Sequence, residues 1–303
     1  MFSWDNKQIL SFCFKFQEKT KKLISKNTIF KIIENKEILG IPLILYMVLA
    51  LNINIDNNSS IVDIYDRIFS LDGGIYDRCI DNKNFADVHR ISVIKNQIHQ
   101  ISREIGIWMF ENNSSEAYIP QSEYQKICNE VMHKSGNKTE ILQQDFKIGN
   151  YFKLVKHCEG VATEDLYFIH RSIYEYFVAE YIYKSISDIA EVSAKELARI
   201  LGKLLKGNLL KNEILRNLKY KIKLCKINNL GNIINDAFHM MLNDGMIYYT
   251  NQCYKNIFKC EMNVFANMLE IIHMFEGIDL KYTENMHKYL KINLNYSRQY
   301  KLT

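Results

Sequence analysis

The sequence is poor in proline and glycine, with two prolines and 12 glycines among its 303 residues. Few turns can therefore be recognised from these residues. It also lacks a long apolar run. The longest, residues 38–51, is too short to span a bilayer and contains Gly40 and Pro42, so we interpret it as a buried helix. We expect no membrane partner, and no signal peptide, because Asp5 and Lys7 stand where its apolar segment would begin.

Cysteine pairs of the kind that bind zinc are missing too. The seven cysteines are scattered without a Cys-x-x-Cys motif, and the eight histidines do not cluster. This pattern predicts reduced thiols in a cytoplasmic protein and no metal site. The formal net charge of +5 is too small to indicate nucleic-acid binding by itself.

A phosphate-binding P-loop is absent, since no Gly-x-x-x-x-Gly-Lys-Ser/Thr motif occurs in the chain. No apolar strand ends in paired acids that could hold Mg²⁺, and the β-α-β alternation of a nucleotide-binding sheet is missing. No Ser/His/Asp, Cys/His or carboxylate pair stands out as catalytic. We therefore expect that the chain alone is not an enzyme.

The most informative stretch that is present runs from residue 166 to residue 181. Its apolar and aromatic start predicts a buried strand, and helical spacing follows. Ser172 and Glu175 have the spacing of a capping box, so we expect Ser172 to cap the helix. His170 would then lie at the strand's end, just ahead of a helix N-terminus, where an anion is favoured.

The pattern Phe-x-His-x-Ser-x-x-Glu-Tyr-Phe-x-Ala at residues 168–179 closely resembles the winged-helix signature of NACHT-type STAND ATPases. That family includes the animal NOD-like receptors and many bacterial signalling and defence proteins. Its signature histidine approaches the β-phosphate of ADP and holds the closed, inactive state. The resemblance implies this nucleotide-binding role for His170. The alternative from the residues alone is a core histidine beside a capped helix.

A second motif of the family, Gly-x-Pro, is matched by Gly40-Ile41-Pro42, 128 residues ahead of His170. In STAND ATPases it opens a helix of the small helical domain, and its proline packs on the adenine. The resemblance implies that role for Pro42. In this sequence, a proline also suits the first turn of a helix, and Gly40 would let the chain turn before it.

The resemblance covers roughly residues 1–184 and implies the downstream part of a NACHT module, from a fragment, a split gene or a decayed copy. The expected partner is the missing ATPase half, in cis or in trans, with ADP or ATP and Mg as cofactors of the joined protein only. Active STAND proteins oligomerise, so a homo-oligomer is expected in the active state.

We predict a mainly α fold in three parts. A small helical domain covers 1–83, a winged-helix domain covers 84–184, and a helical arm covers 185–303, with 293–297 as a candidate start of pentapeptide-type repeats. One small β-hairpin is expected from strands at 151–155 and 166–169. Helices are expected at 4–24 with Ser3 as cap, at 28–35, 61–71 and 88–111, from Pro120, and after Ser193.

The alternative function is a winged-helix DNA-binding regulator. Against it, the recognition helix expected at 122–132 carries Lys126 beside Glu123 and Glu130, and these acids would repel phosphate. Residues 203–226 are strongly basic, with eight basic side chains and one acid around an apolar stripe. They form either the solvated face of a packed helix or a surface for an anionic partner.

Overall fold

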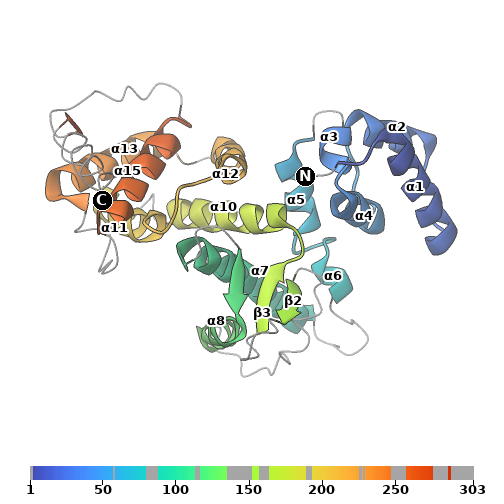
Figure 1. Ribbon diagram of the computed structural model, residues 1–303, viewed down its shortest axis with the longest axis horizontal. Helices are drawn as coiled ribbons and strands as arrows, with labels where there is room; N and C mark the ends of the chain where they lie inside the picture. The colour runs from blue at the N-terminus through green and yellow to red at the C-terminus, as the bar shows by residue number, and fades with distance from the viewer. Residues whose placement is uncertain are drawn as a thin grey trace. The chain divides into compact units, whose positions relative to one another are not determined.

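The computed structural model is mainly helical, as predicted, with one small antiparallel sheet among the described residues (Figure 1). It describes residues 3–56, 59–79, 88–112, 117–134, 152–156, 164–188, 193–224, 227, 229–246, 257–275 and 286–287. The chain divides into two compact units. The first comprises residues 1–101 and 128–151, and the second 102–127 and 152–303.

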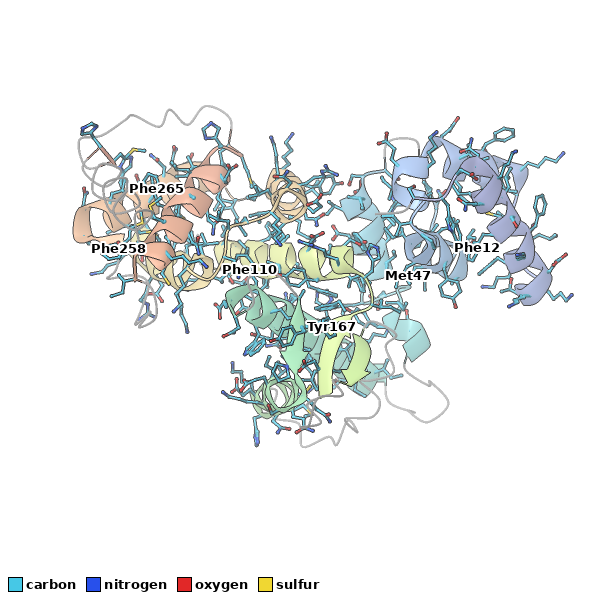
Figure 2. The ribbon with its side chains drawn as sticks, viewed as in Figure 1. Phe12, Met47, Phe110, Tyr167, Phe258 and Phe265 are labelled. Atoms are coloured by element: carbon cyan, nitrogen blue, oxygen red, sulfur yellow. The ribbon has the colours of Figure 1, made fainter. Side chains whose placement is uncertain are left out.

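The first unit begins with six helices, whose apolar faces form its core. They are α1 (Asn6–Thr20), α2 (Lys26–Glu34), α3 (Lys36–Leu39), α4 (Pro42–Leu51), α5 (Ile61–Ile68) and α6 (Tyr76–Cys79). The apolar run interpreted as a buried helix is α4, which buries six of its ten residues. Phe12, labelled in Figure 2, packs its ring 5.1 Å from that of Trp4 and so ties α1 to the segment before it.

The start of α1 differs from the prediction. Asp5, and not Ser3, caps the helix, because its carboxylate accepts from the Gln8 amide while the Gln8 side chain accepts from the Asp5 amide. Ser3 instead lies against Gly40, and the Trp4 amide donates to the Gly40 carbonyl at 2.8 Å. Gly40 has ordinary helical dihedrals. A side chain there would meet Ser3, so close approach, and not a special turn, requires the glycine.

Helix α7 (Val88–Asn112) follows residues 80–87, which lie outside the described residues. Its first half is joined to the end of the small helical region. The Lys95 ammonium, which is buried, pairs with the Asp77 carboxylate, and the Tyr76 hydroxyl lies 2.9 Å from Nδ1 of His99. These contacts lie within the first unit and cross the position of the boundary expected at 84. The three-part division of the chain stays a prediction.

The expected hairpin is present, as β2 (Phe152–Lys156) antiparallel to β3 (Glu164–Phe168). A third strand, β1 (Tyr118–Pro120), pairs with the other side of β3 and gives the order β1-β3-β2. The sequence did not predict it, because three residues ending in proline carry no alternating pattern. Pro120 suits the end of an edge strand. Tyr167, labelled in Figure 2, packs against Tyr118 across β1 and β3.

Helix α8 (Gln121–Lys134) follows β1 directly, and α10 (Arg171–Ser187) follows β3. The order of helices, hairpin and terminal helix is the one that the winged-helix prediction described. Helix α10 continues through the boundary expected at 184, and α12 packs across it (Figure 1).

The remaining helices of the second unit are α11 (Ala194–Leu205), α12 (Asn212–Leu224), α13 (Leu230–Asp244) and α15 (Ile257–Ile272). Helix α11 packs on both α13 and α15 (Figure 1). Ser193 caps α11 by accepting from the Glu196 amide at 3.2 Å. The pentapeptide-type start at 293–297 lies outside the described residues.

Among the described cysteines, Cys13 is a free, buried thiol, as expected for reduced thiols, and Cys128 is buried too. Cys260 differs from that expectation, because it is disulfide-bonded. Over the part of the chain that the structure describes, no helix is both long enough and apolar enough to cross a bilayer.

Candidate functional site

His170 occupies the sharp turn between β3 and α10. The strand ends at Phe168, and the backbone of His170 is extended, with φ −143° and ψ 136°, before the helix begins at Arg171. Its ring nitrogen Nδ1 accepts from the Ser172 amide at 3.3 Å and lies 2.5 Å from the Ser172 hydroxyl oxygen. His170 is therefore itself the N-cap of α10.

This arrangement fixes the tautomer of the ring. A backbone amide can only donate, so Nδ1 of His170 must accept, and the proton of the neutral ring lies on Nε2. The hydroxyl of Ser172 then donates to Nδ1 as well. The Nε2–H group is thus left as the hydrogen-bond donor that the ring can offer to a ligand.

Burial lowers the pKa of His170 below its ordinary value, because a partly enclosed ring loses hydration that the charged form needs. The capping role acts in the same direction, since a proton on Nδ1 would displace the Ser172 amide. At neutral pH the ring is an uncharged donor. It can contact a phosphate oxygen through a hydrogen bond but contributes no charge of its own.

The capping box predicted for Ser172 and Glu175 is wrong. Ser172 lies inside the helix and is buried, and its amide is taken by the His170 ring. The Glu175 carboxylate accepts from Nε of Arg171 at 2.9 Å, one turn earlier. The helix begins two residues sooner than the Ser172 cap implied, because His170 supplies the acceptor.

Arg171 is the charged residue of this site that the sequence reasoning missed. Its side chain is half exposed, whereas Glu175 is buried. Burial raises the pKa of Glu175, and the Arg171 guanidinium opposes that rise. Their spacing of four residues on a helix could have revealed the pair. Arg171 binds the Glu175 carboxylate through Nε, so this pair partly compensates its charge.

The start of α12 contributes further charges near Glu175. Glu213 raises the pKa of Glu175 and Lys211 lowers it, so both lie close enough to influence its carboxylate. The head of α10 thus carries a neutral imidazole, one arginine and a mixed set of charges around it. Such a group can bind one anionic group, whereas the Ser172 hydroxyl that donates to the His170 ring is buried.

Pro42 lies in the first unit, as the first residue of α4, and is partly exposed. Ile41 before it has extended dihedrals and supplies no side-chain cap, so the proline's missing N–H costs nothing there. The prediction that Gly-x-Pro opens a helix is confirmed. His170 belongs to the second unit. The two predicted site residues, Pro42 and His170, therefore lie in different units.

No protein-family model, curated protein or solved structure matches this chain. The resemblance to STAND ATPases accordingly rests on the two sequence motifs. Within the described residues, no group of three or more His, Cys, Asp or Glu side chains is arranged to hold a metal ion.

The basic stretch at 203–226 forms the end of α11, a turn and α12. The apolar stripe is buried as expected, at Leu210, Ile214, Leu218 and Ile222. Most of the described basic side chains around it are exposed, but Lys221 is only 7 % exposed. Its ammonium lies 4.6 Å from the centre of the Tyr176 ring and 4.0 Å from the Glu180 carboxylate. Lys221 therefore joins α12 to α10 through a cation–π contact.

Proposed function

We propose that this chain is the regulatory portion of a NACHT-type STAND signalling ATPase, of the kind used in bacterial signalling or defence. It would sense the state of a nucleotide bound by the ATPase half and control oligomerisation. The observation that carries the proposal is the His170 ring, held through Nδ1 so that Nε2–H is a fixed donor at the head of α10.

This donor fits a nucleotide phosphate. A neutral imidazole donates without adding charge, and the neighbouring Arg171 supplies a cation that favours an anion. The α10 dipole favours a negative group at the same place. The Ser172 amide is taken by the ring, so it contributes indirectly, by orienting His170. Pro42 would pack on the adenine, and loss of the phosphate contact would release the arm.

The DNA-binding alternative is less well supported. In α8, the expected recognition helix, Lys126 lies 3.9 Å from the Glu123 carboxylate. The Glu123 carboxylate beside it would repel a DNA phosphate. Binding to duplex DNA that weakens steeply with added salt would favour that alternative.

The test uses a protein in which the chain is joined to a P-loop ATPase half, in cis or in trans. His170→Ala should weaken ADP binding about tenfold or more, because a hydrogen bond to a charged phosphate is lost. Spontaneous oligomerisation should increase, since ADP holds the closed state. Calorimetry and size-exclusion chromatography measure the two effects.

His170→Asn is the matched variant, because asparagine retains a capping acceptor but its short side chain does not place a donor where Nε2–H lies. It should keep the stability of α10 and still lose ADP affinity. Wild-type ADP affinity and a monomeric state in His170→Ala would leave His170 as an ordinary capping residue and contradict the proposal.

A further inference from the structure

One cluster of positive charge lies at the turn between α1 and α2. Residues 15–31 contain six lysines and one glutamate, so this segment has a formal net charge of +5. Lys31 lies 3.7 Å from the Asp56 carboxylate. The lysines around the turn itself are exposed, at 19, 21, 22 and 26. An anionic surface would therefore be attracted to this end of the unit before any other part.

The same turn presents an apolar side chain at its tip. Leu23 is 95 % exposed, so almost no protein atom flanks it and it protrudes from the surface. Phe14 on α1 and Phe30 on α2, the helices that the turn joins, are 57 % and 65 % exposed. A single exposed leucine needs no explanation, but one surrounded by four lysines combines the two properties of a membrane-contacting tip.

The turn is also held in place by hydrogen bonds. Lys21, in the left-handed conformation at φ 57°, donates its amide to the Gln17 carbonyl at 2.8 Å. The Gln17 side chain donates to the Ile24 carbonyl at 3.3 Å, and Ser25 caps α2 by accepting from the Thr28 amide. Because the backbone is already ordered, binding through this tip costs little conformational entropy.

We propose that the α1–α2 turn, residues 19–26, docks this chain on an anionic phospholipid surface. Leu23 enters the interfacial region, and the surrounding lysines contact the lipid head groups. A protruding side chain fits a deformable lipid surface without a preformed pocket, whereas an acidic protein partner would have to supply one. Clusters of at least four lysines on such elements are typical of binding to acidic lipids. The expectation of no membrane partner rested on the lack of a spanning segment, which docking on a lipid surface does not need.

The test is flotation of the full chain with vesicles of phosphatidylcholine containing about 30 % phosphatidylserine, compared with vesicles of phosphatidylcholine alone. Binding should require phosphatidylserine and weaken with salt. Lys22→Ala with Lys26→Ala should reduce binding about 25-fold, since each lysine near an acidic membrane contributes about fivefold. Leu23→Ser should reduce it about tenfold, as expected for partial burial of a leucine.

Matched controls exist on α12. Lys219→Ala with Lys223→Ala removes the same charge from exposed positions, and Leu224→Ser changes a leucine that is 59 % exposed. Both should bind vesicles like the wild type. The proposal is overturned if the chain does not bind phosphatidylserine vesicles. That result is expected if the tip binds an acidic protein instead. Equal binding to neutral vesicles, or equal losses in the α12 variants, would overturn it as well.

Discussion

A histidine is not among the residues that usually cap helices, and its use at position 170 makes the start of α10 sensitive to protonation. The neutral ring accepts from Ser172, whereas the charged ring could not do so through a protonated Nδ1. His170 therefore joins β3 to α10 and orients its own Nε2–H donor. Protonation of its ring would disturb both the cap and the donor.

The sign of this pH dependence follows from the lowered pKa of His170. The unfolded chain takes up the proton near pH about 6.5, while the native ring resists it. The capping stability is present above that value and is lost as the pH falls below it. We expect the free energy of unfolding, from urea titrations, to fall as pH drops from about 7 to about 5.

In His170→Asn this part of the pH dependence should be missing, because asparagine caps without titrating. His170→Ala should lose about 1 kcal/mol at neutral pH. Ser172→Ala is not a suitable control for these variants, because the Ser172 hydroxyl contacts the His170 ring. Identical pH profiles for the wild type and His170→Asn would contradict the capping role.

Glu111 shows the opposite pH dependence. Burial raises its pKa from 4.5 to about 7, Glu104 adds to the rise, and Lys206 and Lys203 oppose it. Its native carboxyl group holds a proton that the unfolded chain releases, so stability is full at low pH and is lost as pH rises through about 7. At pH 8, the free energy of unfolding of Glu111→Gln should exceed that of the wild type by up to about 3 kcal/mol.

At acidic pH the gain from Glu111→Gln should disappear, because the wild-type carboxyl group is then protonated too. Glu213→Gln changes an exposed carboxylate and should show no comparable gain at high pH. Urea unfolding of the three proteins at both pH values measures the difference. A constant offset between wild type and Glu111→Gln at all pH values would mean that the effect comes from packing.

At the scale of the elements, the turn between α11 and α12 is held by two asparagines of α15. Asn267 accepts from the Leu210 amide at 2.8 Å and donates to the carbonyls of Leu205 and Asn208. Asn263 donates to the carbonyls of Lys206 and Gly207 at 3.0 Å each. Helix α15 thus satisfies the backbone groups that the helix ends leave open, and it fixes where α12 begins.

Asn267→Ala should therefore be strongly destabilising. The side chain is only 1 % exposed, and its loss leaves three backbone groups of the turn without their partner. We expect the free energy of unfolding to fall by about 3 kcal/mol. Asn232→Ala, at an exposed position of α13, should change it by no more than about 0.5 kcal/mol. Thermal or urea unfolding measures both, and similar values for the two variants would contradict the role of Asn267.

Periodicity in the sequence predicted most helices of this chain but not how they begin. The buried stripe of α12, at Ile214, Leu218 and Ile222, follows from apolar spacing alone. The caps of α1 and α10 were misplaced, because serine at a favourable spacing is only one acceptor among several. Ser3 lies against Gly40, so Asp5 caps α1 instead, and His170 caps α10 from the turn after β3. Serine spacing in the sequence does not contain either contact.

For the molecule as a whole, the motifs predicted where the site residues lie in the chain but not what surrounds them. The position of His170 between a strand and a helix could be predicted from residues 166–181. The burial of Lys221 depends on how α12 packs on α10, which is a contact between distant segments. The strand β1 is missed for the same reason, since its partner β3 lies more than forty residues later.

The last prediction concerns the chain as a catalyst. The isolated chain should not hydrolyse ATP and should bind nucleotides weakly at most, because it has no P-loop whose amides and lysine hold the phosphates. A single neutral donor at His170 and a nearby arginine replace only a small part of those contacts. Phosphate release and titration calorimetry with ATP and Mg²⁺ measure turnover and affinity. His170→Ala should leave both unchanged in the isolated chain, whereas it should weaken ADP binding once the ATPase half is joined. Micromolar ATP binding with turnover by the isolated chain would contradict this prediction. A P-loop half encoded upstream and in the same reading frame would identify the partner that the joined protein needs.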